Sequence, residues 1–270
     1  RGLSVCLVDN NHLQSATYPA AGLLSPVTGK RFTLSWNWPL FYQSAKSFYQ
    51  QLTQLFDKPM VTLFPQYRIF SSAKTREMAY KRLQDPQYLD YLGEWDDPQF
   101  SKTAPYGGVW IHGGGVLHTD LFLKYMTTYF QDHNLLRNDL FKNEEAFFNV
   151  DRVIWKDISA RYLVLCYGQS LLTDPYFKLS YKPVKGETID INTQGDSSRV
   201  ISHGKWVVPM DHKRFRVGAT YEWDDLSLNT TLAGRNILEN YINQVWDEPY
   251  SVVDHRAGVR TAVSDFYPVL

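Results

Sequence analysis

The sequence has few of the features that mark other classes of protein. It has only two cysteines in 270 residues, and its 28 basic and 28 acidic residues give a formal net charge of zero. No basic patch or tail stands out, which argues against nucleic acid as the main partner. The sequence also has no signal-peptide pattern and no apolar run long enough to span a bilayer. We therefore expect a soluble, cytoplasmic protein with a core large enough for one big domain or two interleaved ones.

Signatures of hydrolases and metal enzymes are missing as well. The sequence contains no GxSxG motif, no HExxH motif and no Cys/His cluster with zinc spacing, so we expect no metal site. Its glycine cluster, Gly113–Gly115, does not complete a GxGxxG phosphate-binding turn, because His118 stands where the third glycine would be. We predict a flexible turn there. Cys6 and Cys166 lie in apolar, strand-like runs, and we expect both to be buried and reduced.

Residues 3–26 form the stretch that most resembles a ligand site. Leu3–Val8 is a nearly unbroken apolar run, the pattern of a strand buried on both faces of a parallel sheet. It ends at Asp9-Asn10, and an acid at the carboxyl end of such a strand can accept hydrogen bonds from a ribose. The small-residue turn Ala20-Ala21-Gly22 follows, and it lets the backbone approach a bulky partner. A buried strand followed by an ordinary polar loop explains the same pattern.

The first half of the chain alternates helical and strand-like patterns. Pro39–Phe56 and Asp120–Phe130 carry apolar residues at helical spacing, and we expect Thr119 to cap the second helix. Thr75–Leu92 is charged and rich in tyrosine, which indicates a surface helix, and a polar loop is expected over 93–105. Strand-like runs are Met60–Phe64, Tyr67–Ser71, Arg152–Trp155 and Ala160–Cys166, the last of which stops at Tyr167-Gly168.

The second half changes to an antiparallel pattern. Alternating apolar residues predict strands at Glu187–Ile191, Arg199–His203, Lys205–Pro209 and Arg214–Thr220, joined by turns at Gly204 and Asp211-His212. A helix capped by Thr231 follows, with the apolar stripe Ile237, Leu238, Tyr241, Ile242, Val245 and Trp246. The chain thus begins as α/β and becomes α+β, which two intertwined domains explain better than one uniform fold.

Four segments, in order along the chain, carry a resemblance to a known family. They are AAGLLSP, KPVKGETIDI, WVVPMDHKRFRVGATYEWDD and HRAGVRTAVSDFYPVL. Together they resemble the flavin-dependent oxidases of the D-amino acid oxidase superfamily, which includes glycine oxidase and sarcosine oxidase. The resemblance implies an FAD-binding, Rossmann-like (doubly wound) domain interleaved with an antiparallel-sheet substrate domain. We assign residues 1–35, 117–175 and 256–270 to the first and residues 36–116 and 176–255 to the second.

The family carries two further flavin-binding segments that this sequence does not contain. One is a strand with the GxGxxG turn ahead of the position of Leu3, and the other is a glycine segment after the position of Leu270. We expect the sequence to be trimmed at both ends. Asp9 stands where the family usually has Glu, and it can still hold a ribose hydroxyl with a shorter reach.

The resemblance also implies which residues form the site. Arg260 matches the family arginine that grips the substrate carboxylate, and a guanidinium fork suits that task. An arginine in a structural ion pair is the alternative. Trp206 and Tyr221 lie on the meander that would face the flavin, as pocket walls or as ordinary packing. The residues expected to bind FAD are Asp9, Asn10, Ala20, Ala21, Gly22, Leu23 and Gly168.

The implied activity is oxidation of a C–N bond in a small amino acid or N-substituted amine that bears a carboxylate. The α-hydrogen passes as hydride to the flavin, so no catalytic triad is needed. Electrons then go to oxygen or, in a dehydrogenase, to a carrier. A degenerate FAD-fold protein that acts as a binding or scaffold module is the alternative from another class.

Overall fold

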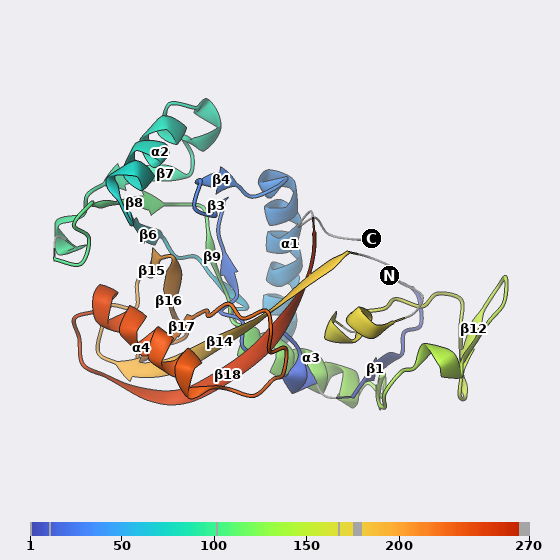
Figure 1. Ribbon diagram of the computed structural model, residues 1–270. Helices are drawn as coiled ribbons and strands as arrows, with labels where there is room; N and C mark the ends of the chain where they lie inside the picture. The colour runs from blue at the N-terminus through green and yellow to red at the C-terminus, as the bar shows by residue number, and fades with distance from the viewer. Residues whose placement is uncertain (1, 11, 101, 167, 175–179, 265–270) are drawn as a thin grey trace.

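An eight-stranded mixed sheet organises the computed structural model, which describes residues 2–10, 12–100, 102–166, 168–174 and 180–264. Neighbouring strands are antiparallel except at one parallel pair in the middle. In spatial order (Figure 1) the strands are β18 (Tyr250–Val263), β14 (Tyr181–Thr193), β17 (Arg214–Gly218), β16 (Lys205–Pro209), β15 (Val200–His203), β6 (Gln66–Ile69), β8 (Gly108–Ile111) and β7 (Leu92–Trp95).

One face of this sheet is covered by helix α4 (Leu232–Val245) (Figure 1). Thr231 caps the helix as predicted, because its side-chain oxygen accepts a hydrogen bond from the backbone N–H of Gly234 at 2.9 Å. The predicted stripe is confirmed at four buried positions, namely Leu238, Tyr241, Ile242 and Val245. It is wrong at Ile237, whose side chain is 48% exposed.

The opposite face is covered by segments from the first half of the chain. These include a small antiparallel sheet of β2 (Leu23–Leu24), β9 (Gly115–Leu117) and β5 (Val61–Thr62). Helices α1 (Trp38–Phe56) and α3 (Thr119–Asp132) pack together beyond it, where Phe56 stacks on Tyr125 with the ring centroids 5.4 Å apart. Both helices were predicted from their apolar spacing.

The remaining elements are short. A parallel pair joins β1 (Leu7–Asp9) to β10 (Leu136–Asn138), and an antiparallel meander contains β11 (Ala146–Phe148), β12 (Val153–Trp155) and β13 (Ile158–Ala160). The others are β3 (Val27–Thr28), β4 (Thr33–Leu34), α2 (Ala73–Leu83) and the 3₁₀ turns η1 (His12–Gln14), η2 (Pro86–Tyr88), η3 (Pro98–Phe100), η4 (Asn143–Glu145) and η5 (Gly168–Thr173). No helix in the described ranges is both long and apolar enough to cross a membrane.

Several local predictions near the N-terminus and around residue 166 were wrong. The apolar run Leu3–Val8 pairs only from Leu7 onward, and Leu3 is 71% exposed. Cys6 and Cys166 are both exposed thiols. The described residues 161–166 form no strand, and Tyr167 lies outside the described residues. An apolar run is buried only where another layer of the protein covers it. None of the described segments covers the runs 3–8 and 161–166.

Two helix predictions also need correction. The helix expected over 75–92 ends at Leu83, because Pro86 cannot continue it and Asp85 instead caps the turn η2 through the N–H of Gln87. The chain then enters β7, inside the expected loop. At α3 the N-cap position is His118 rather than Thr119, whose hydroxyl donates to Ala20 O at 2.9 Å instead.

Candidate functional site

The sheet face away from α4 carries the predicted substrate arginine. Side chains alternate along a strand, so Arg256, Gly258 and Arg260 of β18 point to one face. Pro19 lies on that face, since a Cβ added to Gly258 would come within 2.5 Å of its ring. The predicted turn, which follows Pro19 in the chain, therefore begins on the same face as Arg260.

Arg260 is half-buried and has unused hydrogen-bonding capacity. Its Nη1 atom is buried without a hydrogen-bond partner among the described residues, none of which places a carboxylate within 4.0 Å of the guanidinium. The guanidinium carbon lies 5.1 Å from the centre of the exposed Tyr221 ring, a cation–π contact. A buried donor without a partner costs free energy, which a carboxylate ligand would recover.

The turn Ala20–Leu23 lies against the predicted pocket wall Trp206. Ala21 is buried in a cluster with valines of β9, β15 and β16, and Leu23 and Trp206 pack on that cluster. Gly22 has a φ of +67°, and a Cβ there would collide with the carbonyl oxygen of Leu117. Only glycine meets both conditions without strain.

The other predicted cofactor residues lie at strand and turn ends. Asp9 ends β1 next to Asn138 of β10, and its Oδ2 atom is 3.4 Å from His12 Nδ1. Asn10 follows it and is exposed. Gly168 begins η5 with a φ of +50°. The structure thus groups Trp206 with Ala21 and Leu23, and Arg260 with Tyr221. Asp9 and Asn10 lie elsewhere, at the end of β1 and just after it, and Gly168 lies on η5.

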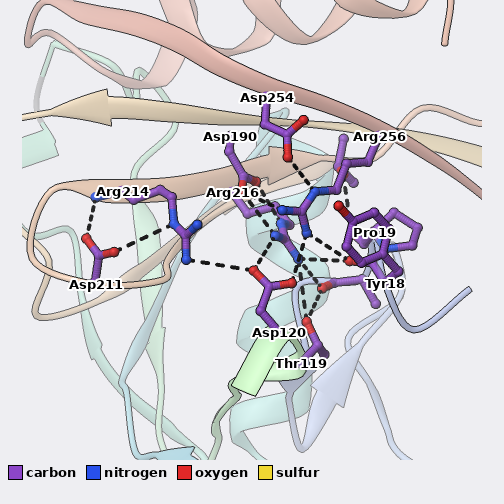
Figure 2. A network of polar contacts seen from close by, with 12 residues as sticks. Tyr18, Pro19, Thr119, Asp120, Asp190, Asp211, Arg214, Arg216, Asp254 and Arg256 are labelled. Carbon is purple, nitrogen blue, oxygen red and sulfur yellow. Dashed lines mark hydrogen bonds and ion pairs between the residues drawn. The ribbon is translucent and has the colours of Figure 1, made fainter. Parts of the chain in front are cut away.

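A buried ionic network that the sequence analysis missed lies beside the turn (Figure 2). At its centre the fully buried Arg216 forms a fork with Asp190, with Nε–Oδ1 at 2.7 Å and Nη2–Oδ2 at 3.0 Å. Nη2 also lies 3.1 Å from Asp120 Oδ2 at the start of α3. Nη1 donates to the backbone carbonyls of Ala20 at 2.8 Å and Tyr18 at 3.3 Å.

Arg256 extends this network on β18. Its Nη1 atom donates to Asp120 Oδ1 at 2.9 Å and to Tyr18 O at 3.2 Å, while Nε donates to Asp254 at 2.7 Å. Burial alone would raise the pKa of Asp120, but attraction by Arg216, Arg256 and Arg214 holds that pKa below its ordinary value. Asp120 is therefore shared by the arginines of both strands, as is Asp190, whose Oδ2 atom lies 3.7 Å from Arg256 Nη2.

A second ionic group lies on the α4 side of the sheet. Lys185 is fully buried, and its Nζ donates to Asp225 Oδ2 at 2.6 Å. That hydrogen bond lowers the pKa of Asp225 to about 2. The buried carboxylate of Glu187 accepts from Thr231 N and Oγ1, both at 2.9 Å, and lies 2.8 Å from His255 Nε2. These contacts fasten the start of α4 to β14.

The donors and acceptors present suit a nucleotide and a carboxylate better than a metal. Asp9 is partly exposed at the end of a parallel strand and offers carboxylate oxygens, a kind of acceptor that can bind ribose hydroxyls. The unpartnered Nη1 of Arg260 suits an anion. Within the described residues, no group of three or more His, Cys, Asp and Glu side chains could hold a metal ion.

Comparison with known proteins agrees with this chemistry. A family model described as FAD dependent oxidoreductase matches residues 1–270. Among solved structures, glycine oxidase from Geobacillus kaustophilus superposes with a TM-score of 0.78 at 17% identity, over 98% of this chain and 78% of that one. Iminodiacetate oxidase from Chelativorans sp. BNC1 gives 0.70 at 17% identity, over 97% and 78%. L-proline dehydrogenase from P. horikoshii gives 0.66 at 11% identity, over 93% and 73%.

These matches confirm the predicted fold class, a mixed α/β flavoenzyme fold. The division into domains and the roles of the individual site residues stay predictions. Strand β18 crosses the expected domain boundary at residue 256 without a break. The expected boundary between residues 175 and 176 lies outside the described residues. The C-terminal residues 265–270 lie outside them as well.

Proposed function

Because this chain belongs to the family of FAD-dependent oxidoreductases, we propose that it oxidises the C–N bond of a small amino acid or N-substituted amine that carries a carboxylate. The observation that carries this proposal is the buried Nη1 of Arg260, which has no partner among the described residues. Glycine and iminodiacetate, named for the oxidases with a similar fold, are both amines with a carboxylate. This similarity supports the substrate class and leaves the individual substrate to experiment.

In the proposed mechanism the protein binds and orients the substrate. Arg260 holds the carboxylate through its guanidinium fork, which fixes the carbon next to the nitrogen relative to the sheet. Trp206 and Tyr221 form walls of the substrate space and limit its access to water. When bound, FAD supplies the oxidising power by accepting two electrons and a hydrogen from that carbon. The imine product hydrolyses in water.

The cofactor would be held by backbone and by polar groups on separate elements. The carboxylate of Asp9 would accept hydrogen bonds from the ribose, and the turn with Gly22 would let the backbone approach the flavin ring closely. The residues assigned to this role are Asp9, Asn10, Ala20, Ala21, Gly22, Leu23 and Gly168. The proposed mechanism gives these residues no acid or base role, because the neutral form of the substrate amine is present in equilibrium with its ammonium form in water.

A visible absorption spectrum of the protein expressed from its complete reading frame tests the proposal. We expect bound-flavin bands that bleach under anaerobic conditions when a carboxylate-bearing amine is added. Oxygen consumption during turnover then separates an oxidase from a dehydrogenase, and dehydrogenase is the activity named for the structurally similar protein from P. horikoshii. A colourless protein that FAD does not reconstitute would contradict the redox function and leave a binding or scaffold role.

A further inference from the structure

Three consecutive backbone carbonyls, the last of them at the start of the turn Ala20–Gly22, accept hydrogen bonds from side chains. Tyr18 O accepts from Arg216 Nη1 at 3.3 Å and from Arg256 Nη1 at 3.2 Å. Pro19 O accepts from Thr188 Oγ1 at 3.2 Å. Ala20 O accepts from Arg216 Nη1 at 2.8 Å, and Thr119 Oγ1 donates to the same atom at 2.9 Å. Side chains from β14, β17, β18 and α3 therefore hold this one backbone segment.

Among these four donors, Arg216 is the one that reaches two of the carbonyls, Tyr18 O and Ala20 O. Its side chain starts on β17, and its exposure is 0%. The fork with Asp190 uses Nε and Nη2 and fixes the plane of the guanidinium, so Nη1 is left to point at the carbonyls (Figure 2). A lysine would provide one charged atom without that fixed plane.

We propose that Arg216 is a positioning residue that fixes the backbone of residues 18–22 in the conformation needed to face the flavin. The proposal rests on the proposed function for its flavin part. Arg216 acts through the backbone carbonyls of Tyr18 and Ala20, and it needs no contact with substrate or cofactor. A residue that served stability alone would change unfolding without changing the local order of this turn or the affinity for FAD.

The test uses substitutions chosen to preserve the buried charge or the side-chain shape at each position. Arg216→Lys keeps a charge for the buried Asp190, and Thr119→Val keeps the side-chain shape but removes the donor to Ala20 O. Arg214→Met is the matched control, because Arg214 lies on the same strand and pairs with Asp120 at 3.7 Å without a contact to residues 18–20. Each variant is made in the protein expressed from its complete reading frame.

Two quantities are measured: amide hydrogen exchange of residues 18 and 20–22 in the FAD-free protein (Pro19 has no amide hydrogen), and the Kd for FAD by titration of flavin fluorescence. We expect Arg216→Lys and Thr119→Val to exchange at least tenfold faster in this segment and to bind FAD at least fivefold more weakly. Arg214→Met should change both quantities less than twofold. Unchanged exchange in the first two variants, or an equal change in the control, would overturn the proposal.

The two hypotheses fail in different ways. If the unsubstituted protein binds no FAD, the proposed function is wrong, whereas the exchange rates still decide whether Arg216 orders the turn. If FAD binds equally well to all variants although exchange accelerates, the turn does not serve flavin binding and the positioning role is rejected.

Discussion

The guanidinium of Arg260 on β18 lies over the backbone of Gly186 on the neighbouring strand β14, where a side chain would otherwise stand. A Cβ added to Gly186 would lie 2.6 Å from Nη2 and 2.9 Å from Nη1 of the arginine. The two residues belong to the β14–β18 ladder, in which Gly186 pairs with Gly258 and Arg260 with Val184. The position of the arginine therefore depends on the absence of a side chain at residue 186.

Gly186→Ala should weaken substrate binding without removing the cofactor. The added methyl group pushes the guanidinium away from its place, and we expect the KM for a carboxylate-bearing amine to rise about tenfold, the effect of about 1.4 kcal/mol. Steady-state kinetics measure the change, and the ratio of flavin to protein absorbance should stay the same. If KM is unchanged for such a substrate, Arg260 does not hold its carboxylate in the place that the structure shows.

Arg260→Leu tests the anchor itself. Removing one partner of a buried, hydrogen-bonded charge pair costs about 2–5 kcal/mol, so KM for carboxylate substrates should rise by roughly 30-fold or more. Arg260→Lys is the matched control, and it should recover only part of the loss, because lysine keeps the charge but lacks the fork. Flavin content should match that of the unsubstituted protein. Equal kinetics for all three proteins would remove Arg260 from the site.

A comparison of Gly22 with Gly29 separates the cost of backbone strain from the cost of a steric clash of an added Cβ atom. Their φ angles are +67° and +66°, but only a Cβ on Gly22 would strike another atom, the carbonyl oxygen of Leu117. Gly29→Ala should cost about 1 kcal/mol, the usual penalty for a left-handed alanine. Gly22→Ala should cost about 2 kcal/mol more and also weaken FAD binding. Urea unfolding gives both free energies, and equal values would mean that the turn can move away from Leu117.

The elements that the sequence predicted well are those whose pattern is local. The meander β15–β17 and helices α1 and α4 follow from apolar residues at strand or helix spacing together with recognisable turns and caps, such as Thr231. Helix α4 and the meander cover each other. In α1 the apolar spacing also predicts the helix, although Leu52 is buried while Phe41, Phe48 and Leu55 are exposed. Leu3–Val8 has an equally clear apolar pattern, but its burial depends on neighbours that the pattern does not contain.

The family resemblance nominated Arg260 and Trp206, and the small-residue turn nominated Gly22, but the roles of all three stay predictions. The network around Arg216 was missed because its partners lie between 26 and 198 residues away in the chain. One signal was available. Arg216 stands between Phe215 and Val217, which are buried towards α4, so the arginine must point to the other face of a covered sheet and needs a partner there.

His118 should make the stability of the fold depend on pH between neutral and mildly acidic conditions. Its Nε2 atom lies 2.8 Å from Thr62 Oγ1, and burial lowers the pKa of the imidazole below its ordinary value of 6.5, although the charge of Asp120 acts in the opposite direction. The unfolded chain therefore takes up a proton at a higher pH than the folded protein. The stabilisation is complete above pH 6.5 and is lost as the pH falls through the folded-state pKa.

His118→Gln keeps a polar group near Thr62 but does not titrate, so its Tm should fall less between pH 7.5 and pH 5 than that of the unsubstituted protein. Thermal unfolding of both proteins at both pH values measures the difference in Tm loss. Asp120 is present in both proteins. Parallel losses of Tm would show that protonation of His118 does not oppose folding, because another titrating group would then account for the whole change.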